Sequence, residues 1–325
     1  MHLEKDALSL EALKKASTRD GFGAGVVEAG EKDERVMVLC ADLAESTRSH
    51  LFKEKFPERY VEIGVAEQNL ATVASGLANY GKIPFITSYA AFSPGRNNEQ
   101  IRTTISLNNV GVVICGMHAG VSVGPDGATH QQLEDIALMR VQPNMTVVYP
   151  SDVEEARKAT IAAASHDHPI YLRFARSNTP IFTTSRTPFE IGKANVLWES
   201  DAPDVAIIAT GPLAHNALLA ARELQGEIEV AVVNLHTIKP LDEEAILALA
   251  QEAGAVVTVE EHQVAGGMGS AVAEYLAKHH PTPMEFVGVR DQFGQSGEPD
   301  ELVEHYGMGV SHIVEAVRRV KARKR

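Results

Sequence analysis

The chain has 325 residues and a formal net charge of −13, with 44% hydrophobic and 22% charged residues. This length can hold two domains of ordinary size, and the composition is typical of a soluble globular protein. A surface with such an excess of negative charge repels polyanions, so nucleic acid is not an expected partner. No apolar run approaches the roughly 18 to 20 residues that cross a bilayer, so a membrane is not expected either.

Two features indicate the compartment. The first residues contain no apolar signal core, which predicts a cytoplasmic protein. The chain has two cysteines, Cys40 and Cys115, and each lies in an apolar run. Two isolated buried cysteines suit a reducing compartment and argue against a cysteine-based zinc site.

Short apolar runs alternate with amphipathic stretches along the whole chain. Strands are predicted at residues 36–40, 85–87, 110–115, 146–149, 170–174, 205–209, 230–233, 256–259 and 286–289. Helices are predicted at residues 67–80, 152–164, 215–224, 242–253 and 269–278. Continuous β-branched runs separated by helices predict an α/β fold of mainly parallel sheets flanked by helices.

The domain organisation follows from a break in this pattern. Residues 179–203 are rich in Thr, Ser and Pro and lack a clear period over most of their length. We therefore expect two α/β domains, 1–185 and 186–325. Ser151 and Asp242 are predicted helix N-caps, and Ser151 forms a capping box with Glu154.

The first candidate for chemistry is Glu67, in the segment Ile-Gly-Val-Ala-Glu-Gln-Asn that opens an Ala-rich helix. The structural interpretation is a glutamate favoured at a helix N-terminus by the helix dipole. The functional one is a carboxylate that binds a basic heteroatom of a cofactor.

The second candidate is a glycine-rich loop, residues 116–131, which directly follows a predicted strand and contains His118, Asp126 and His130. Ligands of open α/β sheets bind at the carboxyl ends of strands, and histidine and aspartate can exchange protons or orient hydroxyl groups. The alternative is a polar surface loop that caps the helix beginning near Gln131.

Two further sets of side chains are ambiguous. Tyr89 and Phe92 follow a predicted strand, where aromatic rings usually belong to the core but can also stack on a flat heterocycle. Arg19, Arg173 and Arg176 could bind phosphate through their guanidinium forks, although a lone arginine is more often part of an ion pair.

The other glycine-rich segments do not predict a nucleotide site. Residues 21–25 lie inside a helical pattern, and residues 266–269 lack dinucleotide-binding spacing, so we interpret the latter as tight packing. The sequence contains no Walker A loop, HExxH or GxSxG motif.

Taken together and in chain order, these segments resemble the C-terminal two domains of transketolase over nearly the whole chain. The resemblance implies that Glu67 hydrogen-bonds N1′ of the aminopyrimidine of thiamine diphosphate. It implies that Phe92 stacks on this ring, with Tyr89 as the alternative, and that Asp42 of the Ala-Asp-Leu segment lies near the cofactor.

The same resemblance implies the substrate contacts. His130 and Asp126 would contact sugar hydroxyls near the reacting carbons. His118, Arg176, Arg19 and Ser46 would hold the phosphate. Glu67, His130 and His118 are thus the expected catalytic residues of a two-carbon ketol transfer between sugar phosphates, as in the pentose phosphate pathway.

One element of thiamine diphosphate enzymes is missing from this sequence. The Gly-Asp-Gly motif that holds the diphosphate through a metal ion does not occur. The resemblance therefore implies no metal ligands in this chain. A partner, the N-terminal transketolase subunit, would hold the diphosphate and Mg²⁺ or Ca²⁺. The expected assembly is an α2β2 heterotetramer that is active only when both subunits are present.

Alternatives remain open within and outside this family. A β subunit of a 2-oxo acid dehydrogenase has a similar domain order but usually lacks the Asp-Gly-x-Thr-His run found at residues 126–130. An enzyme related to 1-deoxyxylulose-5-phosphate synthase is normally one longer chain. A silent scaffold subunit is the alternative that is not an enzyme. The exact ketose and aldose, and the stoichiometry, stay open.

Overall fold

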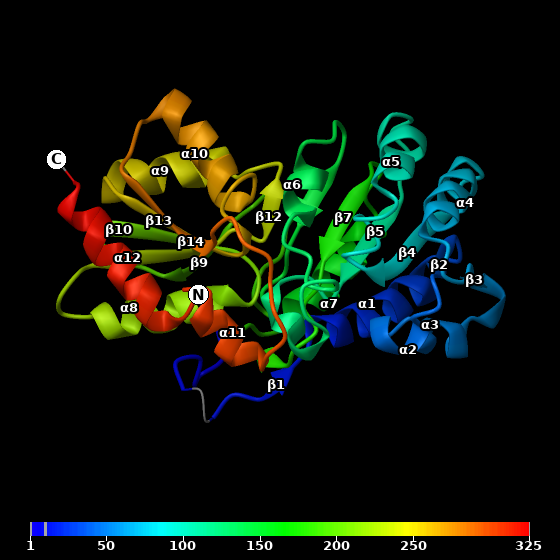
Figure 1. Ribbon diagram of the computed structural model, residues 1–325, viewed down its shortest axis with the longest axis horizontal. Helices are drawn as coiled ribbons and strands as arrows, with labels where there is room; N and C mark the ends of the chain where they lie inside the picture. The colour runs from blue at the N-terminus through cyan, green and yellow to red at the C-terminus, as the bar shows by residue number, and fades with distance from the viewer. Residues whose placement is uncertain (1, 10–11, 325) are drawn as a thin grey trace.

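The computed structural model describes residues 2–9 and 12–324. Two α/β halves lie side by side along the longest axis (Figure 1). The N-terminal half is drawn in blue to green on the right, and the C-terminal half in yellow to red on the left.

The larger sheet has seven strands in the order β12-β6-β7-β5-β4-β2-β3. The six strands from the N-terminal half run parallel, which requires a crossover between consecutive strands. Their bounds are β2 (Val36–Cys40), β3 (Tyr60–Glu62), β4 (Ile83–Tyr89), β5 (Val113–Met117), β6 (Thr146–Val148) and β7 (Ile170–Arg173).

Helices cover both faces of this sheet, so its strands are apolar on both sides. One face packs on α1 (Thr18–Lys32), α3 (His50–Lys55) and α7 (Val153–Ala163). The other packs on α4 (Glu67–Asn79), the π-helix η2 (Ile101–Ser106) and α6 (Asp135–Arg140). Short elements complete this half: β1 (Lys15–Ala16), α2 (Ala44–Thr47), η1 (Pro57–Arg59), α5 (Asn98–Gln100), η3 (Val121–Asp126) and β8 (Thr179–Pro180).

The second sheet has five strands in the order β14-β13-β10-β11-β9. All are parallel except β9 at the edge, which pairs antiparallel with β11. The strands are β9 (Asn195–Trp198), β10 (Val205–Ala209), β11 (Val230–Asn234), β13 (Val256–Gln263) and β14 (Met284–Val289). The helices are α8 (Leu213–Leu224), α9 (Glu243–Ala253), α10 (Met268–His279), α11 (Pro299–His305) and α12 (Val310–Ala322).

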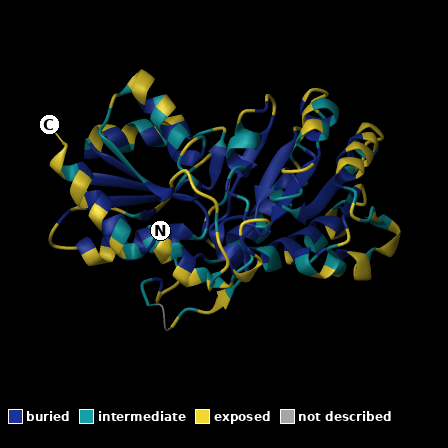
Figure 2. Ribbon diagram, viewed as in Figure 1, coloured by how far each residue is buried: buried dark blue, intermediate teal, exposed yellow. Residues whose placement is uncertain are grey.

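The two halves share a core. Strand β12 (Thr237–Lys239) leaves the C-terminal half and pairs antiparallel with β6. One cluster of buried side chains runs from Leu70 of α4 through Tyr149 to Ile246 of α9 and Val272 of α10. The inner strands of both sheets are buried, whereas the edge strands β3 and β9 are partly exposed and the outer helical faces are exposed (Figure 2). The position of one half relative to the other is therefore fixed by apolar packing.

The predicted fold class is confirmed, and every strand and helix predicted from periodicity is present within a few residues. One helix cap was wrong: Asp152, not Ser151, caps α7, and its side chain accepts from the Glu155 amide. Asp242 caps α9 as predicted. Strands β1, β3, β8, β9 and β12 were not predicted because each has only two to four residues, and β8 and β9 lie within the stretch that had no clear period. The domain division at 185/186 stays a prediction.

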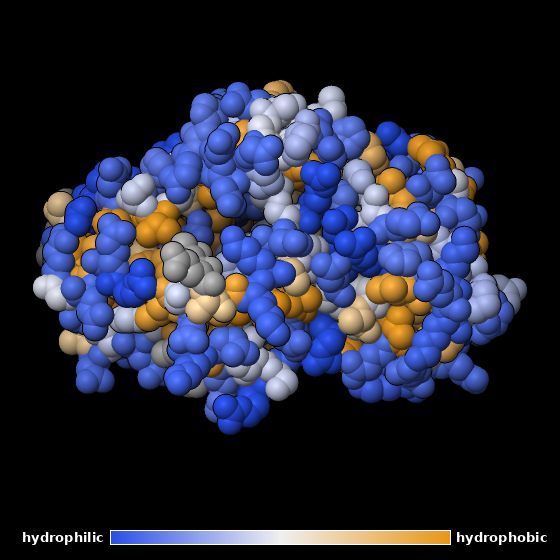
Figure 3. Space-filling view, turned by 90° about the horizontal axis from the view of Figure 1, so that it is seen from below, coloured by the Kyte–Doolittle hydropathy of each residue, from blue (hydrophilic) through white to orange (hydrophobic). Residues whose placement is uncertain are grey.

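Two surface findings complete the description. Among the helices of residues 2–9 and 12–324, none is both long and apolar enough to cross a membrane. Seen from below, the molecule presents a mainly hydrophilic face on which hydrophobic side chains reach the surface over both halves (Figure 3).

Candidate active site

Glu67 is the first residue of α4 and is 1% exposed. The chain reaches it through a tight turn in which Gly64 has φ +76°, a conformation that favours glycine. The Glu67 carboxylate therefore lies in the first turn of the helix, where the helix dipole favours negative charge. The Glu67 carbonyl also accepts from Asn97 Nδ2 at 2.9 Å, which ties the start of α4 to the segment after β4.

Arg96 is the ionic partner of Glu67. Its Nη1 donates to Glu67 Oε2 at 2.6 Å, and its guanidinium lies 4.7 Å from the centre of the Phe92 ring. The Arg96 side chain is 47% exposed, so the cation covers the buried carboxylate from the solvent side. Sequence reasoning did not single out Arg96, although it ends the aromatic segment that follows β4.

Four rings gather beside this ion pair at the carboxyl ends of β4 and β5. Tyr89 and Phe92 are stacked with centroids 5.9 Å apart and an interplanar angle of 16°. The His118 and Tyr89 ring centroids lie 4.0 Å apart, and those of His130 and Phe92 lie 5.4 Å apart in a T-shaped arrangement. The structure therefore brings both predicted aromatic residues and both predicted histidines into one cluster.

His118 is 1% exposed and connects the ring cluster to Arg19. Arg19 Nη1 lies 3.0 Å from His118 Nε2 and donates to the Ser46 carbonyl at 2.8 Å. Arginine can only donate, so His118 Nε2 accepts and the ring proton lies on Nδ1. His118 Nδ1 has no partner among the described residues, so a buried donor is left for a ligand.

Burial, followed by the positive charges of Arg19 and Arg176, lowers the pKa of His118 to about 3. The imidazole is therefore neutral near pH 7. Any negative charge that a ligand brings to this point would be balanced by the guanidinium groups and not by His118.

The arginines considered for phosphate binding separate into two kinds. Arg176 is partly exposed, and its Nη1 donates to the Val123 carbonyl at 2.7 Å. Arg173 is fully buried and donates to Asp135 Oδ2 at 2.7 Å. Arg19 and Arg176 are thus able to meet an anion, and Arg173 is committed to an internal ion pair.

Asp42 follows the carboxyl end of β2, and Asp126 lies in the loop after the carboxyl end of β5. Neither carboxylate belongs to the cluster of four rings. Asp42 follows β2 with φ +60°, and Asp126 ends η3; both side chains are exposed. No hydrogen bond or ion pair found within the described part of the chain joins either carboxylate to the ring cluster. The roles assigned to the site residues remain predictions.

The donor set fits a flat nitrogen heterocycle better than a metal ion. Residues 2–9 and 12–324 contain no group of three or more His, Cys, Asp or Glu side chains able to hold a metal. Both cysteines are buried and free, as predicted. In contrast, Glu67 Oε1 has no hydrogen-bond partner among the described residues, and it belongs to a buried carboxylate beside stacked rings.

The glycines at 266–269 serve packing, as interpreted from the sequence. A Cβ at Gly267 would lie 2.2 Å from Glu260 Oε2, and one at Gly269 would lie 2.4 Å from Thr258 Oγ1. These glycines therefore let α10 approach β13 closely.

Comparison with known proteins agrees with this arrangement. Sequence models of the transketolase pyrimidine binding domain and the transketolase C-terminal domain match residues 14–181 and 192–313. The 6-deoxy-6-sulfo-D-fructose transketolase subunit SqwH of Clostridium sp. (strain MSTE9) is 41% identical over 94% of this chain and 95% of its own length. A solved structure described as a split gene transketolase, inactive beta4 tetramer, superposes with a TM-score of 0.89 at 43% identity, covering 95% of this chain and 99% of its own.

A longer relative shows which part of a transketolase is present. Transketolase-like protein 2 of Mus musculus is 39% identical over 93% of this chain, and this chain covers 48% of that protein. Both domain matches and the nearly full-length relatives lead to one conclusion. The chain belongs to the transketolase family and carries its pyrimidine-binding and C-terminal domains.

Proposed function

We propose that this chain is the subunit of a thiamine-diphosphate-dependent transketolase that holds the aminopyrimidine. In this proposal it transfers a two-carbon ketol unit between sugars only together with a diphosphate-binding partner. The observation that carries the proposal is the environment of Glu67. Its carboxylate is buried, and Oε1 has no hydrogen-bond partner among the residues that the structure describes. Oε2 accepts from Arg96, which contacts the Phe92 ring, itself stacked with Tyr89.

The proposed role of Glu67 is to hold a proton against N1′ of the aminopyrimidine. The Glu67 carboxylate can accept a hydrogen bond from protonated N1′ with little further loss of hydration free energy, because it is already desolvated and paired with Arg96. Phe92, or Tyr89 behind it, would present its face to the ring. When bound, thiamine diphosphate supplies the nucleophilic carbon that attacks the ketose carbonyl.

On the substrate side, His118 and His130 line the approach to the stacked rings. His118 is a neutral donor through Nδ1, so it can orient a sugar oxygen without adding charge. His130 and Asp126 are proposed to contact hydroxyl groups near the reacting carbons. Arg19 and Arg176, with Ser46, would bind the anionic end of the sugar.

Two kinds of anionic group fit this site. A guanidinium fork can bind phosphate or sulfonate through paired oxygens. The sulfo-sugar named for the clostridial relative makes the sulfonate a specific alternative to the phosphate.

A partner is supported by the surface of α4, at the right-hand end in Figure 1. Glu67 is the only charged residue of this helix, and it is buried. The exposed face carries Gln68, Asn69, Thr72 and Val73. Around it Val65, Tyr80 and Leu107 are 71%, 89% and 73% exposed. An uncharged, partly apolar face next to an incomplete cofactor site suits a protein interface. We propose that it receives the subunit that holds the diphosphate and Mg²⁺ in an α2β2 assembly.

The test compares this chain alone with this chain mixed with the diphosphate-binding subunit, each with thiamine diphosphate and Mg²⁺. We expect transfer from xylulose 5-phosphate or 6-deoxy-6-sulfofructose to an aldose phosphate only in the mixture. Robust transfer by the isolated chain would refute the half-enzyme proposal.

Two further assays separate the remaining alternatives. Decarboxylation of pyruvate without sugar transfer would identify a 2-oxo acid dehydrogenase component, and condensation of pyruvate with glyceraldehyde 3-phosphate a deoxyxylulose phosphate synthase. A mixture that binds no thiamine diphosphate would point to a scaffold subunit.

A further inference from the structure

A carboxylate from the C-terminal half holds the backbone of the glycine-rich loop. Glu261, near the end of β13, is 2% exposed. The Ser122 amide donates to Glu261 Oε1 at 2.6 Å, and the Ser122 hydroxyl donates to Oε2 at 3.2 Å. The two residues are 139 positions apart in the chain, so the contact joins the two halves.

The loop approaches Glu261 so closely that it needs a glycine there. Gly120 has φ +90°, and a Cβ on it would lie 2.3 Å from Glu261 Oε1. Its amide donates to the Gln132 carbonyl at 2.9 Å, and the neighbouring Ala119 amide donates to the Phe174 carbonyl. The residues that follow His118 are thus fixed to β7 and to the end of the loop, and then to Glu261.

The other side of the same peptide segment faces the candidate anion site. The Ser122 carbonyl accepts from the Ser177 hydroxyl at 2.6 Å, and the Val123 carbonyl accepts from Arg176 Nη1 at 2.7 Å. Residues 122–123 therefore lie between Glu261 and Arg176. A shift of Ser122 away from Glu261 would move the carbonyl that orients the Arg176 guanidinium.

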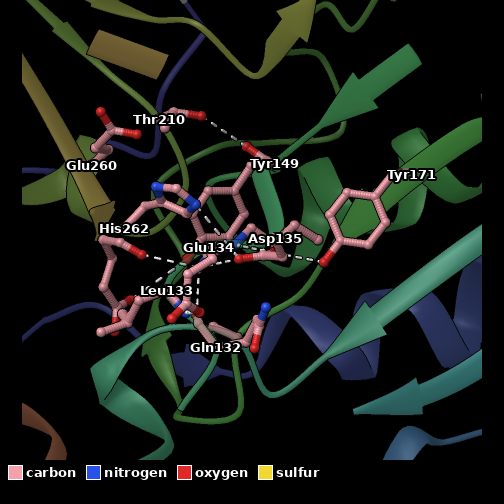
Figure 4. Close-up of polar contacts among 12 residues, drawn as sticks. Gln132, Leu133, Glu134, Asp135, Tyr149, Tyr171, Thr210, Glu260 and His262 are labelled. Atoms are coloured by element: carbon pink, nitrogen blue, oxygen red, sulfur yellow. Dashed lines mark hydrogen bonds and ion pairs between the residues drawn. The ribbon is translucent and has the colours of Figure 1, made fainter. Parts of the chain in front are cut away.

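The Glu261 backbone is itself held against the N-terminal half. The Glu261 carbonyl accepts from Arg173 Nη2 at 3.0 Å, and the Arg173 guanidinium lies 4.4 Å from the centre of the Tyr149 ring. Arg173 also pairs with Asp135. Asp135 accepts from the Tyr171 hydroxyl at 2.6 Å, and both of these side chains are labelled in Figure 4. This buried network fixes the Glu261 backbone and thereby the position of the Glu261 carboxylate.

A second segment of the C-terminal half packs on the same loop. A Cβ at Gly124 would lie 3.2 Å from the Gly297 carbonyl, and one at Gly127 would lie 2.7 Å from Ser296 Oγ. The loop is thus covered by the segment before α11 as well as by Glu261. Polar contact with the C-terminal half comes from the Glu261 carboxylate and from the Gln295 carbonyl, which accepts from Gln131 Nε2 at 2.9 Å.

We propose that Glu261 is a positioning residue of the active site, through which the C-terminal domain sets the conformation of the loop that carries His118 and orients Arg176. This inference rests on the proposed function, because it takes the loop as the sugar-binding element. Glu261 itself touches neither sugar nor cofactor in this proposal.

The neighbouring Glu260 provides a matched control. It is 1% exposed and its carboxylate also accepts from two backbone amides, those of Met268 at 2.6 Å and Gly269 at 2.8 Å. Both amides belong to α10 of the same half. Truncation of Glu260 therefore removes a buried carboxylate of the same kind without releasing the glycine-rich loop.

The experiment uses Glu261→Ala, Glu261→Gln and Glu260→Ala in the complex with the diphosphate-binding subunit. We expect Glu261→Ala to raise the KM for the sugar donor about tenfold, as for the loss of one charge-assisted hydrogen bond, with a smaller change in kcat. Glu261→Gln, which keeps an acceptor for the Ser122 amide, should recover most of this loss. Glu260→Ala should lower the Tm while leaving the KM at the wild-type value.

Amide hydrogen exchange gives a second readout that does not require activity. Exchange of peptides covering residues 118–130 should accelerate in Glu261→Ala and stay at the wild-type rate in Glu260→Ala. Unchanged exchange and KM in Glu261→Ala would overturn the inference, as would an equal rise of KM in Glu260→Ala.

A failure of the variant to assemble and a failure of the proposed function can be told apart. If Glu261→Ala does not assemble, Glu261→Asp withdraws the charged group by one methylene and is judged by the same two readouts. If the wild-type complex transfers no ketol unit, the proposed function fails, and the exchange comparison alone decides whether Glu261 holds the loop.

Discussion

Glu67 Oε2 and Arg96 Nη1 lie 2.6 Å apart, yet the Glu67 side chain is 1% exposed and that of Arg96 is 47% exposed. The carboxylate is thus desolvated while its cation remains partly in water. The ion pair therefore joins a carboxylate buried in the site to a guanidinium group that water can reach.

Replacing Glu67 tests the proposed proton contact directly. We expect Glu67→Ala to fold and to assemble, and to lose transfer activity by about 10²- to 10⁴-fold, the usual contribution of a positioned proton-transfer group. The measurement is kcat in the assembled complex, with Glu54→Ala, an exposed carboxylate on α3, as the control. Near-normal turnover by Glu67→Ala would contradict the assignment.

Replacing Arg96 tests the ion pair itself. Arg96→Ala leaves a buried carboxylate without its cation, so we expect the free energy of unfolding to fall by about 1–3 kcal/mol. Arg35, whose pair with Asp33 is on the surface, is the matched control, and Arg35→Ala should destabilise the chain clearly less than Arg96→Ala. Urea unfolding of the isolated chain measures both. Equal losses would show that the Glu67 carboxylate does not depend on Arg96.

His118 should make the protein sensitive to acid. Its pKa is lowered by burial and by the nearby arginines to about 3 in the folded chain, against an ordinary value of 6.5. Between these values the unfolded chain binds the proton and the folded one does not, so stability falls as the pH decreases below 6.5. The slope for one such proton is about 1.4 kcal/mol per pH unit.

The check is urea unfolding of wild type and His118→Asn between pH 4.5 and 7.5. Asparagine tolerates the φ of +54° found at this position. The variant should lose the part of the acid-side slope that one proton contributes, because the buried His215, His236 and His262 also have a lowered pKa and remain. A substitution of the exposed His279 serves as the control. Parallel curves for wild type and His118→Asn would show that this imidazole is protonated in the folded chain.

Glu260 should change the stability with the opposite sign, over a pH range that overlaps that of His118 and extends higher. Burial raises the pKa of Glu260 to about 7, against an ordinary value of 4.5. Between these values the folded chain binds the proton more tightly than the unfolded one, so stability decreases as the pH rises from 4.5 to 7. The loss is complete above pH 7 and amounts to about 3 kcal/mol at most.

Glutamine has no carboxyl proton to lose. Glu260→Gln should therefore remove the contribution of Glu260 to the pH dependence of the free energy of unfolding. The difference in free energy of unfolding between variant and wild type should therefore shift in favour of the variant as the pH rises from 5 to 8. A difference that stays constant over this range would mean that Glu260 is ionised throughout.

Much of the fold was predictable because its signals are local. Continuous apolar runs such as Val205–Ala209 match single strands, and the start of α4 at Glu67 was predicted at the residue where it occurs. The short edge strands β9 and β12 were not, since three or four residues carry too little periodicity to be recognised. Their pairing depends on edges that exist only after the two sheets have formed.

The sequence by itself determined which loops carry the candidate groups, because the carboxyl ends of parallel strands meet at one edge of a sheet. The resemblance to transketolase then joined Glu67, Phe92, His118 and His130 in one hypothesis. Only the tertiary structure decided their partners. The pairing of Glu67 with Arg96 spans 29 residues, and that of Ser122 with Glu261 spans 139. Such partners are brought together when whole helices and sheets pack against each other. The local spacing of residues in the sequence does not indicate this packing.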